Sequence, residues 1–300
     1  MPSSARSAPT ADLSYCARDV RRYDNDRFLT ALFAPAGRRE GLFTLLAFNL
    51  EIAKTREVVT EPLIGQMRLQ WWRDAIDGCY QPPGQRPPAP AHEVARPLAE
   101  AIDRHHLPRE PFDRLIDARE TDLAETPPAS LAELVDYAGA TGAPVVELGL
   151  GVLGLEAWSR DAATAAAEAG RAVGTAWALT GLLRAVPFHA RQRRVMLPAD
   201  LLGRQGLSAG RLIDRRPEPP VLAPVVAEVV AVARAHLDTA RRLAHRVPAA
   251  ALPALLPATL ADLYLHRLAA ADHDVFAPRV MVRHPLRPLW LAWRAWRRRY

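Results

Sequence analysis

The stretch LLAFNLEIAKTREVV, residues 45–59, carries the first group of side chains that could do chemistry. Its apolar spacing predicts one amphipathic helix, on which Glu51, Lys54 and Glu57 share a face at positions i, i+3 and i+6. Carboxylate oxygens are ligands that Mg²⁺ takes, but Lys54 places a cation between them. At this spacing the three charges can neutralise one another. Two interpretations stay open: a helix derived from a metal site, or an ordinary solvated charged face.

Arginine dominates the basic residues. Lys54 is the only lysine, a bias typical of GC-rich coding DNA, as in many bacteria. The formal net charge of +6 suits an anionic partner such as a diphosphate group or a membrane surface. The sequence has no recognisable nucleic-acid-binding motif, so we expect no nucleic-acid partner.

The last residues, HPLRPLWLAWRAWRRRY, combine tryptophan with arginine. At helical spacing the apolar side chains fall on one stripe, with arginines available for the polar side. Such a helix suits an anionic membrane interface. The residues expected to contact the membrane are Trp290, Trp293, Trp296, Arg297 and Arg298. The alternative is a terminal helix that docks on the rest of the protein by its tryptophans.

Two other groups suggest structure rather than chemistry. The segment ADHDVF offers Asp272, His273 and Asp274, but adjacent residues on a helix point apart, so we interpret it as a helix end. Cys16 and Cys79 lie far apart without metal-ligand spacing, which predicts buried thiols in a reducing compartment. We expect no metal site from these residues.

Helical periodicity recurs along the chain, with proline as the main punctuation and no strand or repeat signal. Ser130 and Glu133 predict a capping box at the start of one helix. The expected helical segments are residues 11–22, 26–33, 45–59, 64–80, 93–106, 111–125, 131–154, 161–186, 221–246 and 247–276, with a proline-rich loop at 81–92.

These segments predict an all-α fold with one domain. We place a flexible N-terminus at residues 1–10, the helical domain at 11–283 and a basic, tryptophan-rich amphipathic tail at 284–300. The start of the chain lacks an apolar signal segment, and no run approaches the roughly 20 apolar residues of a membrane span. We therefore expect a soluble or peripheral protein.

Five segments resemble the squalene/phytoene synthase family, the head-to-head prenyl transferases. They are LFTLLAFN, LIDARETDL, LVDYAGATGAP, VGTAWALTGLLRA and RRVMLPADLL. They occur in the family's order and span most of the chain. The resemblance implies the isoprenoid synthase fold, a bundle of helices around a central apolar cavity.

The family's chemistry implies two acidic motifs on facing helices. Their carboxylates hold Mg²⁺ ions, which bridge the substrate's diphosphate and stabilise it as it departs. Aligned with the first motif, this chain has Ala53, Lys54 and Glu57 at the aspartate positions, so one carboxylate of three remains. Lys54 would place a cation where a metal should lie.

The second acidic motif is more strongly altered. Its ligand positions fall on Gly181, Ala185 and His189, and Arg184 stays without its carboxylate neighbour. Pro187 is expected to bend or end the helix there. A lone histidine is more often a hydrogen-bonded pocket residue than a metal ligand, so we expect neither a metal nor a cofactor.

Further segments are most similar to one branch of this family, which contains a mitochondrial complex I assembly factor and its bacterial relatives. They are AFNLEIA, GQMRLQWWRDAI, RAVPFHARQRRVMLP and DHDVF. The resemblance implies a non-catalytic assembly factor whose partner is a respiratory-complex subunit or an assembly intermediate. The implied location is cytoplasmic and peripheral to the inner membrane, or the matrix face of mitochondria in a eukaryote.

Two alternatives remain. An active prenyl transferase would use Mg²⁺ and would need Glu57, Asp117 or Asp122 to rebuild a metal site. A metal-free protein that binds isoprenoids or quinones could hold an anionic head group by arginine, the candidates being Arg56, Arg184, Arg193 and Arg194. The full set of vestigial pocket or ligand candidates is Asn49, Glu51, Lys54, Arg56, Glu57, Asp122, Arg184, His189, Arg193 and Arg194.

Overall fold

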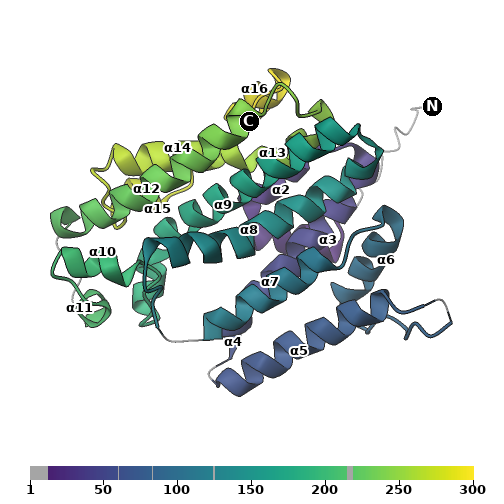
Figure 1. Cartoon of the computed structure of the whole chain (residues 1–300), viewed down its shortest axis with the longest axis horizontal. Helices are drawn as coiled ribbons and strands as arrows, with labels where there is room; N and C mark the ends of the chain where they lie inside the picture. The colour runs from purple at the N-terminus through teal and green to yellow at the C-terminus, as the bar shows by residue number, and fades with distance from the viewer. Residues whose placement is uncertain (1–12, 60, 83, 124–125, 215–218) are drawn as a thin grey trace, which may run out of the picture.

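The computed structural model describes residues 13–59, 61–82, 84–123, 126–214 and 219–300. Within these ranges the chain forms helices and no strand, which confirms the all-α prediction (Figure 1). The predicted flexible N-terminus, residues 1–10, lies outside the described residues.

Most helices follow the predicted segments, but the short helices α10, α11 and α15 lie where no helix was expected. Their bounds are α1 Tyr15–Tyr23, α2 Asn25–Ala31, α3 Ala36–Ala53, α4 Thr55–Val58, α5 Pro62–Cys79, α6 Ala95–His105, α7 Glu110–Glu120, η1 Thr121–Leu123, α8 Leu131–Val152, η2 Leu155–Ala157 and α9 Arg160–Arg191. The chain continues with α10 Ala199–Arg204, α11 Ala209–Asp214, α12 Pro219–Arg242, η3 Ala249–Ala251, α13 Leu252–Leu255, α14 Pro257–Ala269, α15 Pro278–Met281 and α16 Arg287–Trp296.

Two predicted helices differ from the structure. The helix expected over residues 45–59 begins already at Ala36 and is interrupted at Lys54, and its last turn, α4, ends before the extended Val59. The expectation that Pro187 bends or ends its helix at this point is wrong, because α9 continues to Arg191. Proline removes one backbone hydrogen bond, and a helix of 32 residues packed along its length tolerates that loss.

The ends of the other helices carry the expected local signals. Ser130 caps α8 by accepting a hydrogen bond from the backbone N–H of Glu133 at 3.2 Å. The Glu133 carboxylate accepts from the backbone N–H of Ala129 at 2.7 Å, one residue before the N-cap, so the Ser130 half of the predicted capping box is confirmed and the Glu133 half is shifted by one residue. The segment from Asp272 to Asp274 follows α14, and the left-handed backbone of Asp272 and His273 makes it a turn, as predicted.

Two large apolar clusters and one small one form the core, and α8 contributes to both large clusters. Val146 and Leu150 face a cluster built from α8, α9, α12 and α14. Val145 and Leu148 face a second cluster, which includes α1, α3, α5, α6 and α7. Figure 1 shows this arrangement as successive rows of helices, from α5 and α7 through α8 and α9 to α12 and α14. α8 therefore lies between the two halves of the molecule.

α8 and α9 approach each other more closely than side chains would allow. A Cβ placed on Gly142 would overlap the carbonyl oxygen of Gly174, and a Cβ placed on Gly174 would lie 2.6 Å from the Cα of Ala143. Because glycine has no Cβ, the two backbones touch at this crossing. The crossing fixes how α8 and α9 are placed relative to each other.

α12 is, by length and composition, the one helix in the described part of the chain that could cross a membrane. Its apolar residues include Leu222, Val226, Val229 and Ala233, which are buried in the core cluster shared with α9 and α14. We therefore interpret α12 as a core helix.

We expect Gly142→Ala to lower the free energy of unfolding by about 2–3 kcal/mol or more, because the added methyl group must push two backbones apart. Gly181→Ala on α9 is the matched control, since a Cβ there meets nothing within 4 Å. That control should be neutral or stabilising by up to about 1 kcal/mol, because alanine favours helix. Chemical denaturation measures both variants, and equal stabilities would contradict the tight crossing.

Candidate functional site: a polar cavity between the altered motifs

A polar cavity with a volume of about 230 Å³ lies between the C-terminal part of α3 and the second half of α9. The residues from the two altered motifs that line it are Ala53 and Glu57 on one side and Gly181, Ala185 and His189 on the other. The structure therefore brings residues of both altered motifs together across one cavity, but Lys54 does not line it. The other polar and charged residues of its wall include Arg27, Asn49, Arg56, Arg119, Asp122, Tyr137 and Arg194.

Seven helices, α2, α3, α4, α7, η1, α8 and α9, contribute side chains to the wall. Asn49 lies in the last turns of α3, and Arg56 belongs to α4. Asp122 lies in η1, directly after α7, while Tyr137 comes from α8. The cavity depends on the α8–α9 crossing, because Gly142 lines it beside residues of both helices.

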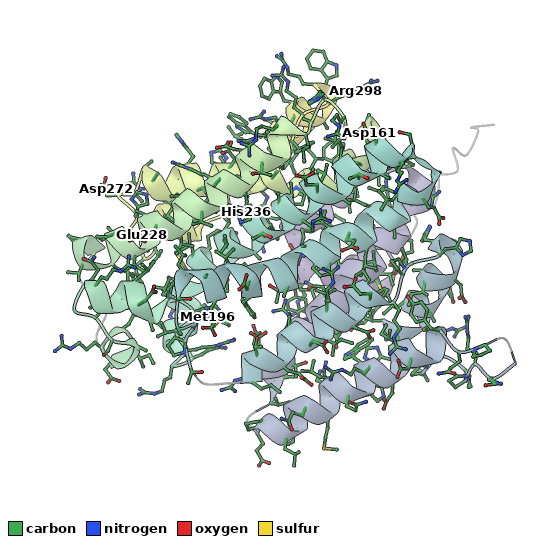
Figure 2. The ribbon with its side chains drawn as sticks, in the orientation of Figure 1. Asp161, Met196, Glu228, His236, Asp272 and Arg298 are labelled. Carbon is green, nitrogen blue, oxygen red and sulfur yellow. The ribbon has the colours of Figure 1, made fainter. Side chains whose placement is uncertain are left out.

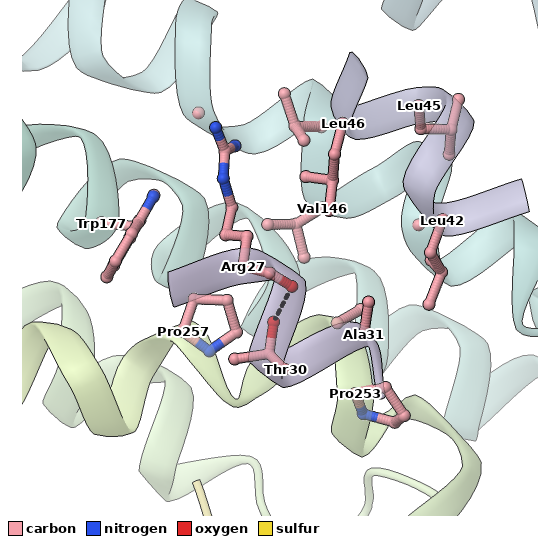
Figure 3. A pocket seen from close by; sticks show the side chains of 14 residues that line it. Arg27, Thr30, Ala31, Leu42, Leu45, Leu46, Val146, Trp177, Pro253 and Pro257 are labelled. Carbon is pink, nitrogen blue, oxygen red and sulfur yellow. Dashed lines mark hydrogen bonds between the residues drawn. The ribbon is translucent and has the colours of Figure 1, made fainter. Parts of the chain in front are cut away.

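A smaller apolar pocket adjoins the polar cavity, and both are lined by Arg27, Gly142 and Trp177. Its other walls include Leu42 and Val146 (Figure 3). Its volume is only about 40 Å³. An apolar cavity of about 150 Å³ holds one benzene ring, so this pocket is far smaller than the large apolar cavity that the family resemblance implied.

Asp122 is held by three partners. Its carboxylate accepts hydrogen bonds from Arg194 at 2.7 Å, from the Tyr137 hydroxyl at 2.6 Å and from Arg119 at 3.1 Å. Burial alone would raise the pKa of Asp122, but the two guanidinium groups outweigh it and hold that pKa below its usual value. Asp122 therefore carries a negative charge and is ion-paired with Arg119 and Arg194.

Three buried polar atoms in the wall have no hydrogen-bond partner among the described residues: Asn49 Oδ1, His189 Nδ1 and Arg119 Nε. Asn49 is 4% exposed, and its Oδ1 has no hydrogen bond among the described residues. His189 Nδ1 is likewise buried and without a hydrogen-bond partner there. Burial lowers the pKa of His189 to about 4; nearby Arg194 adds to this shift and Asp122 opposes it. His189 is therefore neutral at physiological pH.

The prediction that Lys54 occupies the metal position between Glu51 and Glu57 is wrong. Lys54 turns away from the cavity toward α1, where its Nζ lies 3.5 Å from Asp19 and 3.9 Å from the centre of the Tyr23 ring. Glu51 is paired instead with Arg68 at 2.6 Å. Lys54 follows Ala53 directly, and successive residues on a helix point about 100° apart, so only one of the two can face the cavity.

Two of the four arginines predicted to hold a head group do not line the cavity. Arg184 stacks on Tyr264, with its Cζ 3.7 Å from the ring centre, and lies 3.8 Å from the buried carboxylate of Asp26. Arg193 has the positive φ of 58° in the turn after α9, and its exposed side chain contacts Asp214 at 3.3 Å. The same turn directs Arg194 inward.

The structure adds cavity residues that the sequence did not single out. Arg27, Arg119, Tyr137 and Trp177 all line the polar cavity. Arg119 and Asp122 stand at positions i and i+3, and this spacing could have predicted the ion pair between them. Nothing local marked Arg27 or Trp177, which come from helices far apart in the sequence.

The residues present do not fit a Mg²⁺ cluster. The described residues contain no group of three or more His, Cys, Asp or Glu side chains that could hold a metal ion. In the cavity wall the carboxylates are Glu57 and Asp122, and Asp122 is engaged by two arginines. Facing motif positions carry Ala53, Gly181 and Ala185, which have no ligand atoms in their side chains.

The tail helix α16 has two different faces. Leu291 is fully buried against α14, and Arg287 lies 3.1 Å from Asp26. The opposite stripe is exposed, up to 80% for Trp296, so α16 docks on the domain through Leu291 and Arg287 rather than through its tryptophans. The exposed stripe consists of Leu286, Leu289, Trp290, Trp293 and Trp296, and Arg297 and Arg298 beside it are also exposed.

Comparisons with known proteins agree with the fold and the motifs. A family model described as squalene/phytoene synthase matches residues 20–290. The chain is 35% identical over 288 residues to the NADH dehydrogenase (ubiquinone) complex I, assembly factor 6 of Rattus norvegicus, covering 95% of this chain and 82% of that protein. It is 26% identical over 208 residues to the chloroplastic phytoene synthase 1 of Arabidopsis thaliana, covering 67% of this chain and 47% of that protein.

Among solved structures, the squalene synthase HpnC from Alicyclobacillus acidocaldarius matches with a TM-score of 0.71 at 22% identity. The match covers 86% of this chain and 93% of that chain. At this identity the match shows the fold, and it confirms the isoprenoid synthase architecture.

The low pKa of His189 gives a testable dependence of stability on pH. The unfolded chain takes up this proton near pH 6.5, whereas the folded protein resists it until about pH 4. Folding stability should therefore fall as the pH decreases from about 6.5 to 4, by up to about 3 kcal/mol from this group. His189→Asn should remove that contribution, as measured by denaturation at several pH values. An imidazole pKa near 6.5, measured by NMR, would contradict the buried neutral state.

Proposed function

The chain belongs to the squalene/phytoene synthase family, and from this premise we propose that it is a non-catalytic member that acts as an assembly factor for respiratory complex I. The observation that carries the proposal is its similarity to complex I assembly factor 6 along 95% of its length. Similarity to a phytoene synthase is weaker and shorter. The partner would be a complex I subunit or an assembly intermediate.

The geometry of the polar cavity supports a non-catalytic role. Ionisation of an allylic diphosphate needs metal ions to stabilise the departing anion. The cavity has alanine or glycine at facing motif positions, and Asp122 is bound by arginine. The adjoining apolar pocket, at about 40 Å³, also leaves no room for two prenyl chains. Both features disfavour a prenyl transferase.

The exposed stripe of α16 supports a location at a membrane surface. Leucine and tryptophan enter the region between lipid headgroups and acyl chains, while arginine is attracted to anionic headgroups. We place the protein on the cytoplasmic side, peripheral to the inner membrane, or at the matrix face in a mitochondrion. Figure 2 shows Arg298 of the tail well away from Met196, which lines the polar cavity.

Deletion of the gene should lower the amount of assembled complex I and leave the isoprenoid profile unchanged, because the protein assists assembly and makes no prenyl product. Native gels and lipid extracts from the same cells measure both quantities. Re-expression of the wild type should restore the complex. Lost isoprenoid products with normal complex I, or Mg²⁺-dependent turnover of farnesyl diphosphate by the purified protein, would contradict the proposal.

Replacing Trp290, Trp293 and Trp296 by serine should weaken binding to vesicles that contain anionic lipid by at least about tenfold, because three exposed indole groups that would insert into the lipid interface are lost. A cosedimentation assay measures the binding to vesicles, which should also weaken as the salt concentration rises. The matched control replaces Leu63, Ile64 and Met67, three exposed apolar residues of α5, by serine. Equal effects of both triple variants would contradict a specific role of the tail.

A further inference from the structure

A groove with a volume of about 480 Å³ lies between α5, α6 and the proline-rich loop that joins them. Trp71 lines it and is 38% exposed. The groove and the polar cavity share no lining residue, so they are separate sites. Most of the other wall residues are small or are prolines, which leave the groove open: Ala75, Gly78, Ala89, Ala99, Pro87, Pro88 and Pro90.

An exposed apolar stripe on α5 continues the groove. Ile64, Met67 and Trp71 stand at positions i, i+3 and i+7, so they share one face of the helix. Ile64 is 48% exposed and Met67 is 66% exposed. Ala75 and Gly78 lie further along the same face and line the groove. From Ile64 to Gly78 the stripe is about 21 Å long, at a rise of about 1.5 Å per residue, which matches about four turns of a partner helix.

The fold does not account for all the apolar residues of α5. Residues 65–76 form one of the segments by which the sequence resembles the assembly-factor branch of the family. Within that segment Leu69, Trp72 and Ile76 are buried in the core cluster shared with α3, α6 and α7. Met67 and Trp71 are exposed instead. Exposed apolar patches typically mark sites of interaction with another molecule.

The walls of the groove are held in place without a partner. Arg86 in the loop donates hydrogen bonds to both carboxylate oxygens of Asp103 on α6, at 2.8 and 2.7 Å. The ring of His92 lies 5.2 Å from the ring of Trp71. His92 also accepts a hydrogen bond from the backbone N–H of Val94 at 3.1 Å, directly before α6. A surface that is formed in advance loses less conformational freedom on binding.

The groove lies in the acidic part of a protein whose formal net charge is +6. Residues 61–123, which include α5, α6 and α7, hold eleven acidic residues and eight arginines. Asp74 accepts a hydrogen bond from the neutral amide of Gln70 at 2.8 Å and has no ion-pair partner within the described part of the chain. The groove therefore favours basic side chains, which the Trp71 ring also attracts. Two arginines of the wall stand against three carboxylates, those of Asp74, Glu100 and Asp103.

Two other occupants fit this surface less well. An anionic membrane would repel the carboxylates of the groove, and Figure 1 shows α5 at the opposite edge of the molecule from α16. A second copy of the chain that paired α5 with α5 would bring two acidic surfaces together. A different protein that carries positive charge meets neither objection.

We infer that the α5 groove, meaning the stripe of Ile64, Met67 and Trp71 together with the cavity beside Asp74, docks a helix of the complex I subunit or assembly intermediate. The apolar face of that helix packs on Ile64 and Met67, and a basic side chain beside that face reaches Asp74. The inference rests on the proposed assembly role and names the surface that carries it.

A photoreactive amino acid placed at Met67 of the full chain, in living cells, tests which molecule occupies the groove. We expect an adduct with a complex I subunit, identified by mass spectrometry, in a segment with helical apolar spacing and arginine or lysine beside it. The same amino acid at Val221, which is exposed on α12, is the control and should give no such adduct. An adduct with a second copy, or no adduct with a complex I subunit, would overturn the inference.

Variants of the groove, expressed in cells that lack the gene, test its role in assembly. Ile64→Glu combined with Met67→Glu places charge in the apolar stripe and should lower the amount of assembled complex I at least about fivefold. Asp74→Arg reverses the charge of the groove and should lower it at least about threefold. Asp238→Arg makes the same exchange at an exposed position of α12 and should restore the complex. Native gels measure the complex, and melting temperatures of the purified variants confirm that they fold.

The assembly role and the docking surface fail in different ways. If deletion of the gene leaves complex I unchanged, both are wrong. If deletion lowers complex I but the groove variants restore it as fully as Asp238→Arg does, the assembly role stands and the groove is not its docking surface. Equal losses with Asp74→Arg and Asp238→Arg would also overturn the inference, because the effect would then not depend on the groove.

Discussion

The contact between the backbones of Gly142 and Gly174 is the constraint on which the rest of the structure depends. With no side chain at the crossing, α8 and α9 lie at backbone contact over this point. Gly142 also lines both the polar cavity and the apolar pocket. The same crossing that holds the two core clusters together therefore sets the distance between Tyr137 on α8 and His189 on α9. A methyl group at Gly142 would change the core and the cavity at once.

The electrostatics of the cavity follow from one carboxylate. Asp122 is buried, and without Arg119 and Arg194 it would have to stay neutral or take up a counter-ion. Breaking a buried pair typically costs about 3–5 kcal/mol, although the whole pair adds little net stability. The network therefore fixes the shape of the cavity more than it stabilises the fold. The network also engages the Asp122 carboxylate, which a metal site would need as a ligand.

Much of the fold was predictable from the sequence, because apolar periodicity and proline mark most helices and Ser130 marks the start of α8. The pairing of the two altered motifs across one cavity was also predictable, through resemblance to the family. The directions in which single side chains point were not predictable from the sequence. Lys54 faces Asp19 because it lies one helical step beyond Ala53, and Arg193 and Arg194 diverge because Arg193 has a left-handed backbone. The sequence shows that Ala53 and Lys54 must point in different directions, but which of them faces the cavity depends on tertiary neighbours.

The tail shows that docking on the domain leaves an apolar stripe free for another contact. A helix that is apolar along two stripes can bury one and expose the other, and α16 buries Leu291 while it exposes its tryptophans. Ionic as well as apolar contacts hold α16 on the domain. The carboxylate of Asp26 lies 3.1 Å from the guanidinium group of Arg287 and accepts a hydrogen bond from the Tyr264 hydroxyl at 2.6 Å. Asp26 precedes Arg27, which lines the polar cavity, so the residue that holds the tail adjoins a residue of the site. Because the anchored face fixes the rotation of the helix about its axis, the tryptophan stripe is held outward before any membrane is met. An interface that is oriented in advance loses less conformational freedom on binding than a flexible tail would.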